Sequence, residues 1–83
     1  MRYELTSHAK KALAEREIPL EWLERALTQP ELTLPDPDDP EVERRFRKIP
    51  EFGGRVLRVA VNTTVEPVRI VSVFFDRTMK GQL

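Results

Sequence analysis

The chain has 83 residues, of which 40% are hydrophobic and 34% are charged. A chain of this length has room for one hydrophobic core, so we expect a single domain over residues 1–83. It carries 14 basic residues, 14 acidic residues and no cysteine, which excludes disulfide scaffolds, thiolate zinc sites and cysteine nucleophiles. No apolar segment is long enough for a signal peptide or a membrane span, and we expect a cytoplasmic protein.

Two short amphipathic helices are expected in the first third of the chain. A strand candidate at residues 2–5 leads into Thr6-Ser7, either of which can cap a helix over about residues 8–16. A second helix begins at Pro19, a residue suited to a first helical turn, and ends near residue 30. Residues at three- and four-residue spacing give the helices one buried stripe each: Ala9, Ala12 and Leu13, then Leu20, Leu23, Ala26 and Leu27.

After residue 30 the apolar period changes from helical to alternating, which is typical of strands. Proline and aspartate dominate residues 35–40, which we interpret as an exposed loop. The order β-α-α-β-β-β-β predicts an α+β fold with two N-terminal helices packed on a small, twisted and mainly antiparallel sheet. After the strand at residues 2–5, the strands are expected at residues 32–34, 42–49, 55–62 and 68–75.

The last two predicted strands are apolar at nearly every position, so we place them centrally with one face against the helices. Alternation along the strands and the helix stripes then select the core. Val71 and Val73, on the opposite face of the last strand, are expected to be less covered. The core candidates are Leu13, Leu23, Leu57, Val59, Val61, Ile70 and Phe74.

Charge is segregated in the middle of the chain, although the whole chain is neutral. Residues 36–43 hold five acids and no base, whereas residues 44–58 hold six bases against the single acid Glu51. Alternation places Arg45 and Arg47 together on one face of their strand. Clustered bases are unfavourable without an anionic partner, but acids from the neighbouring loop can equally neutralise a solvated face. Both interpretations stay open at this point.

His8 is the one histidine, the residue type that exchanges protons most readily near neutral pH. At the start of a helix it would suit a general base, or it would be a partly buried residue bonded to a backbone carbonyl. Trp22 lies beside apolar helix positions, where packing on the sheet is favoured over stacking on a nucleobase. We expect no metal site, because the acids of residues 36–43 lack the calcium-loop spacing and glycine.

Several segments resemble a known bacterial family, domain-of-unknown-function family 4258, whose first helix reads His-Ala-x-x-Arg-x-x-Glu-Arg-Gly-Ile. The combination is also similar to the RelE and BrnT type ribonuclease toxins. The resemblance implies a small RelE/BrnT-like fold that cleaves or binds RNA and often pairs with a small antitoxin protein. The segments that carry it are residues 3–9, Glu15-Arg16, Ile18, residues 22–30, residues 54–59 and residues 68–77.

Two positions depart from the family pattern. The arginine four residues after the histidine is Ala12 here, and the glycine before the isoleucine is Glu17. Because residues four apart share a helix face, the expected His-Arg pair is reduced to His8, with Arg16 two turns further on. Lys11 is the neighbouring base that can substitute for the missing arginine.

Cleavage of RNA without a metal ion needs a base for the 2′-hydroxyl, cations for the phosphorane and an acid for the leaving oxygen. We assign His8 as the general base or acid. Arg55 and Arg58 are assigned as phosphate clamps, and Arg77 with Lys80 as a C-terminal contact. Further substrate-binding candidates are Tyr3, Lys11, Arg16, Arg45 and Arg47.

The first functional hypothesis is therefore a toxin-like, metal-independent endoribonuclease that needs no cofactor. The alternative is a non-enzymatic module of the same fold that binds RNA or a partner protein. A structural or regulatory domain without a nucleic-acid ligand is the third. The catalytic candidates are His8, Arg55, Arg58 and Arg77. We expect an enzyme if these four side chains share one concavity, and a binding module or a structural domain if they lie on different faces.

Overall fold

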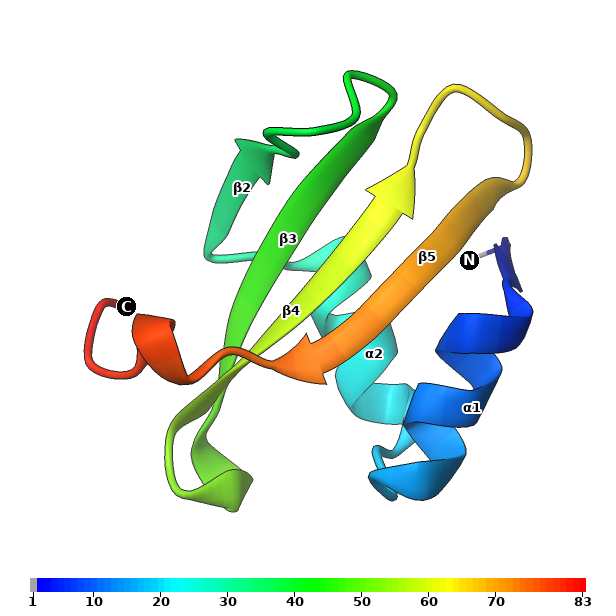
Figure 1. Cartoon of the computed structure of the whole chain (residues 1–83). Coiled ribbons are helices and arrows are strands. Elements are labelled where there is room, and N and C mark those ends of the chain that lie inside the picture. Colours follow the sequence, from blue (N-terminus) through cyan, green and yellow to red (C-terminus); the bar gives the residue numbers. More distant parts are fainter. Residues whose placement is uncertain (1) are drawn as a thin grey trace.

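The structure is a computed structural model that describes residues 2–83, and it has two helices on one face of a five-stranded sheet (Figure 1). This arrangement confirms the predicted α+β class and the order β-α-α-β-β-β-β. The helices end in short connections, and a 3₁₀ turn follows β3 and another follows β5. The elements are β1 (Tyr3–Leu5), α1 (Ser7–Glu15), α2 (Leu20–Thr28), β2 (Leu32–Pro35), β3 (Val42–Ile49), η1 (Pro50–Phe52), β4 (Arg55–Asn62), β5 (Val68–Phe75) and η2 (Arg77–Met79).

The sheet has the strand order β1-β5-β4-β3-β2, so the two last strands lie inside it as predicted. β2, β3, β4 and β5 pair antiparallel, and the short β1 pairs parallel with β5. The parallel pair arises because α1 and α2 and the whole meander separate β1 from β5 in the chain. β1 adds only three residues to that edge.

Both ends of α1 follow from local backbone chemistry. Thr6 is the N-cap, and its hydroxyl oxygen accepts a hydrogen bond from the backbone N–H of Ala9 at 3.1 Å. At the other end, the N–H of Ile18 donates to the carbonyl of Leu13 at 2.9 Å, which closes a Schellman motif. The residue directly before Ile18 is Glu17, with a φ of +50°. This left-handed conformation suits glycine, the residue that the family pattern has there.

The core lies between the helices and the inner face of the sheet. Leu13, Leu23, Leu57, Val59, Val61 and Ile70 are buried there, as predicted. The prediction for Phe74 is wrong, because a β-bulge between Ala60 and Val61 shifts the pairing with β5. Val73, 1% exposed, takes the inward position, and Phe74 is half-buried on the opposite face.

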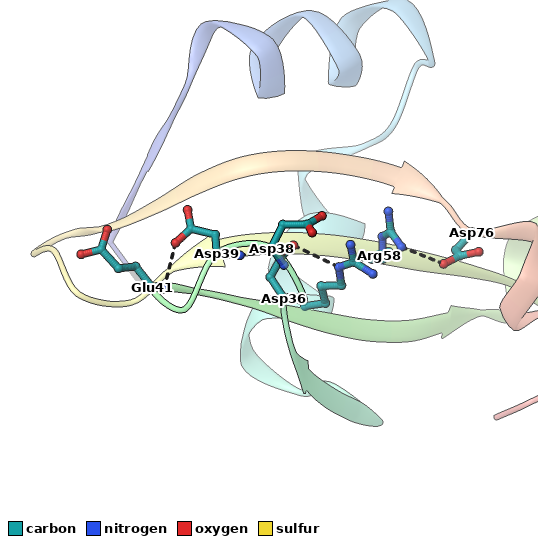
Figure 2. A network of polar contacts seen from close by, with 7 residues as sticks. Asp36, Asp38, Asp39, Glu41, Arg58 and Asp76 are labelled. Carbon is teal, nitrogen blue, oxygen red and sulfur yellow. Dashed lines mark hydrogen bonds and ion pairs between the residues drawn. The ribbon is translucent and has the colours of Figure 1, made fainter.

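The outer face of the sheet, away from the helices, carries a row of ion pairs between apolar residues. Phe46 and Val56 are buried there, although no helix covers them. The Asp36 carboxylate, at the start of the proline-rich loop, lies 3.2 Å from Nε of Arg44. Figure 2 shows Asp36, Arg58 and Asp76 along this row, with the helices on the other side of the sheet. The acidic loop thus neutralises part of the basic segment that follows it in the chain.

Candidate functional site

One end of the sheet holds a cavity of about 370 Å³. It lies where β4 begins and β5 ends, and the end of α1 and the two 3₁₀ turns contribute to its walls. Four cations from distant parts of the chain and a half-buried aromatic ring surround it. We call it the basic cavity; its lining residues are Arg16, Phe52, Arg55, Val56, Phe75, Asp76, Arg77 and Lys80.

The four cations of the basic cavity differ from most other bases of the chain. Among residues 2–83, none of Arg16, Arg55, Arg77 and Lys80 lies within 4 Å of a carboxylate oxygen. All four are exposed. The one acid of the lining is Asp76, and both its oxygens are engaged elsewhere. The basic cavity therefore presents positive charge that the protein itself does not neutralise.

Asp76 fixes the segment that carries two of these cations. Its Oδ1 accepts hydrogen bonds from the Thr78 backbone N–H at 3.0 Å and the Thr78 hydroxyl at 2.6 Å, and so caps η2. Its own N–H donates to the carbonyl of Val56 at 2.9 Å, which ties the turn to β4. The Thr78 hydroxyl is the main cause that holds the pKa of Asp76 below its usual value. η2 thereby places Arg77 and Lys80 beside Arg55.

Arg58 reaches the basic cavity only through Asp76. Its Nη1 lies 3.2 Å from Oδ2 of Asp76 (Figure 2). Its guanidinium carbon lies 4.0 Å from the centre of the Phe74 ring. Burial, with Arg44 nearby, lowers the pKa of the Arg58 guanidinium below its usual value. Arg58 is not among the residues that line the basic cavity. Its direct contacts are with Asp76 and Phe74, and its assignment as a phosphate clamp stays a prediction.

The 3₁₀ turn η1 forms the opposite wall. Arg25 of α2 donates two hydrogen bonds to the Glu51 carboxylate, at 3.0 and 2.8 Å, and so joins α2 to η1. The same pair holds the pKa of Glu51 at about 2. The next residue, Phe52, packs against Trp22 and Phe75 with ring centres 5.6 and 4.9 Å apart. Trp22 therefore packs on the end of the sheet, as predicted.

His8 lies in a neighbouring cavity of about 240 Å³, which we call the histidine cavity. His8 and Lys11 project from α1, and Lys11 lies 3.8 Å from the Glu15 carboxylate in an exposed ion pair. Arg16 lines both cavities and so connects them. The lining residues of the histidine cavity are His8, Lys11, Ala12, Glu15, Arg16, Val73 and Phe74.

The remaining candidates lie away from both cavities. Arg45 and Arg47 point toward α2, where they donate to the carbonyls of Leu27 at 2.9 Å and Gln29 at 3.0 Å. These carbonyls belong to the end of α2, where a helix leaves acceptors unpaired and cations are favourable. The Tyr3 hydroxyl donates to Glu24 at 2.8 Å; burial and this bond raise the pKa of Tyr3 to about 12.

The structure thus brings together Arg16, Arg55, Arg77 and Lys80 around the basic cavity. The four catalytic candidates do not share one concavity, because His8 lines the adjoining cavity and Arg58 lines neither. Sequence reasoning missed Phe52 and Asp76. A signal for Asp76 existed, because an aspartate two residues before a threonine at the end of a strand is a typical capping turn. Phe52 stands before a glycine pair, which marks a turn but does not indicate which way the ring points.

The comparison with protein families confirms the resemblance to domain-of-unknown-function family 4258. The family described as Domain of unknown function (DUF4258) matches residues 5–75, which include both helices, all but the first two residues of the sheet and His8. The chain belongs to this family. The match ends before Arg77 and Lys80, so those two cations of the basic cavity lie outside the DUF4258 region. No curated protein and no solved structure matches the chain.

Residues 2–83 hold neither a metal-binding cluster nor a membrane-spanning helix. No group of three or more histidine, cysteine, aspartate or glutamate side chains is placed to hold a metal ion. In the same residues, neither helix has the length and apolar content needed to cross a bilayer.

Proposed function

We propose that this protein is a toxin-like endoribonuclease that binds the RNA backbone in the basic cavity and cleaves it without a metal ion. One observation carries the proposal. Four cations that have no carboxylate partner within the described residues 2–83 surround one cavity, and this cavity adjoins the one that holds the only histidine of the sequence, with Arg16 common to both. The resemblance of the chain to RelE and BrnT type toxins agrees with this activity and points to a small antitoxin protein as a partner.

The charge of the basic cavity favours a phosphodiester. Like charges held close together are unfavourable unless an anion binds between them, and phosphate oxygens match the planar fork of arginine. Three of the four cations are arginines: Arg16, Arg55 and Arg77. A single RNA strand offers a phosphate at every nucleotide. Adjacent phosphates can therefore contact different cations of the basic cavity, including Arg16, at the same time.

The chemistry assigned to the histidine cavity is general acid–base catalysis. His8 takes the proton of the 2′-hydroxyl, whose oxygen attacks the adjacent phosphorus, or gives a proton to the departing 5′-oxygen. The cations stabilise the negative charge that builds up on the phosphorane oxygens. Of the four cations of the basic cavity, only Arg16 also lines the cavity of His8, so we assign it to this role.

A second candidate function is RNA binding without cleavage. It is favoured by two observations: His8, Arg55, Arg58 and Arg77 do not share one concavity, and Ala12 lines the histidine cavity where the family pattern has an arginine. A missing cation one turn from His8 removes a group that would hold the reacting phosphate. The binding module and the enzyme use the same basic cavity and differ only in what happens at His8.

A cleavage assay on single-stranded RNA with chelator present tests the proposal. We expect His8→Ala to keep the melting temperature of the wild type and to lower the cleavage rate at least about 100-fold, because a general acid or base contributes about 10² to 10⁴. Lys10→Ala is the control, since Lys10 is exposed on α1 and lines neither cavity. RNA that is bound but never cut by the wild type would favour the binding module. Absence of binding at low salt would exclude both functions.

A further inference from the structure

The basic cavity has an apolar side that a phosphate group does not need. Phe52, Val56 and Phe75 are the apolar residues of its lining. Its volume of about 370 Å³ lies within the range of roughly 300–1,000 Å³ that is usual for sites of small organic ligands. Sites with one apolar and one charged side fit ligands that have both characters. A nucleotide is such a ligand, because its base has an apolar face and its phosphate is charged.

Phe52 and Arg55 form a stacked pair at this apolar side, which we call the stacking platform. The guanidinium carbon of Arg55 lies 4.7 Å from the centre of the Phe52 ring. Phe52 is 40% exposed although it also contacts Trp22 and Phe75. Among residues 2–83, Arg55 has no carboxylate within 4 Å, so its orientation over the ring is not set by an ion pair. The stacking platform therefore presents a planar cation and part of an aromatic ring to the basic cavity.

The stacking platform is held in place before any ligand binds. The two hydrogen bonds from Arg25 to Glu51 fix η1, and the packing of Phe52 on Trp22 and Phe75 fixes the ring. Gly53 then turns the chain with a φ of +66°, a conformation that L side chains rarely adopt, and brings Arg55 back over Phe52. A surface organised in advance loses little conformational freedom on binding.

We propose that the stacking platform binds an unpaired nucleobase of single-stranded RNA, while the neighbouring phosphate lies among Arg16, Arg77 and Lys80. This inference rests on the proposed function and adds which part of the RNA is recognised. Aromatic rings and arginine planes stack on bases of any sequence, and only unpaired bases expose their faces. The site is therefore selective for single strands and tolerant of base sequence.

A binding experiment with two oligomers of equal length tests the inference. One is a short single-stranded RNA, and the other is the matching ribose-phosphate oligomer without bases. Both affinities are measured at the same salt concentration and under conditions in which neither oligomer is cleaved. We expect the wild type to bind the RNA about tenfold more tightly, which corresponds to a typical contribution of one stacked base. Phe52→Leu keeps an apolar side chain and Arg55→Lys keeps the charge, but each removes a planar group. In each variant the ratio of the two affinities falls to within about threefold of unity.

The control is Leu34→Ala, because Leu34 is 42% exposed on β2 and lies outside the basic cavity. This variant keeps the ratio of the wild type, and thermal melts confirm that all variants fold. Equal affinity of the wild type for both oligomers would overturn the stacking role and leave RNA binding by the cations intact. Equal affinity for single-stranded and double-stranded RNA would also overturn it. If neither oligomer binds, the proposed function and this inference fail together.

Discussion

Two groups of arginine residues differ in what surrounds them. On β3 and β4, Arg44, Arg45 and Arg58 each lie within 3.2 Å of a carboxylate oxygen. Around the basic cavity, Arg16, Arg55 and Arg77 have no such partner among residues 2–83. The first group holds three of the six bases in the basic segment, residues 44–58, that the sequence makes conspicuous. The comparison teaches that pairing in the fold, rather than the density of bases in the chain, locates a candidate anion site.

The paired group has a structural role that its charge alone does not indicate. Arg45 and Arg47 donate to the last carbonyls of α2, which otherwise have no helical partner. Arg58 holds Asp76, and Asp76 in turn holds η2. The paired arginines therefore attach a helix and a turn to the sheet, whereas the unpaired cations remain available for a ligand.

The largest effect is expected from the residue that links the two groups. Asp76→Ala removes the cap of η2 and leaves the partly buried Arg58 without its counter-charge, so the free energy of unfolding should fall by about 2–3 kcal/mol. Urea unfolding measures the loss. Asp38→Ala, an exposed acid of the proline-rich loop, is the control and should change stability by less than about 0.5 kcal/mol. A loss below about 1 kcal/mol for Asp76→Ala would mean that the link does not hold the turn.

The next prediction compares one arginine of each group. Arg77→Ala should weaken binding of single-stranded RNA by about 1.5–3 kcal/mol, the usual value of a charge-assisted hydrogen bond. The slope of log affinity against log salt should fall by about 0.7, because one phosphate contact is lost. Arg44→Ala should leave both quantities at their wild-type values in protein that a thermal melt shows to be folded. Equal effects of the two substitutions would remove the distinction between paired and unpaired arginines.

Low pH should reduce the stability that Asp76, the partner of Arg58, contributes to the fold. The pKa of Asp76 is lower in the folded protein than in an unfolded chain, where aspartate titrates near 3.9, so the unfolded state binds protons first as the pH falls. The stability from Asp76 is therefore fully present above about pH 5 and is lost as the pH falls through the folded pKa. Urea midpoints measured from pH 7 to pH 3 should fall less steeply for Asp76→Asn than for the wild type. Glu4→Gln, on the exposed side of β1, should follow the wild type; parallel curves for all three proteins would contradict the assignment.

The smallest effect is expected beside Arg16, at the position where the family pattern has glycine. Glu17→Gly removes the cost of a left-handed conformation and should raise the free energy of unfolding by about 0.5–1 kcal/mol. Thermal or urea unfolding measures the gain. Because Glu17 is one of the two acids next to Arg16 in the chain, the same variant also tests whether Glu17 pairs with Arg16 in solution. RNA affinity within about twofold of the wild type would support that; a large increase would show that Glu17 competes with RNA for Arg16.

The sequence predicted the helices and strands well. It predicted less well which side chains of β5 point into the core. Helix stripes and strand alternation located Leu23, Leu57 and Val59 in the core, since these signals are local and repeat along each element. The error at Phe74 came from the bulge at Ala60 and Val61. A bulge adds one residue to one strand and reverses the alternation beyond it, and nothing in a single apolar strand marks its position.

By itself the sequence determined the α+β class, the element order and a helix cap at Thr6 or Ser7, because all of these follow from neighbours along the chain. Only the tertiary structure decided which cations meet. Arg16, Arg55 and Arg77 come from the end of a helix, the start of one strand and the turn after another, and they share one cavity because those three ends coincide. The same packing brought acids to Arg44 and Arg58 and, within residues 2–83, left the cavity cations without any, since an ion pair depends on distance in space rather than on distance in the chain.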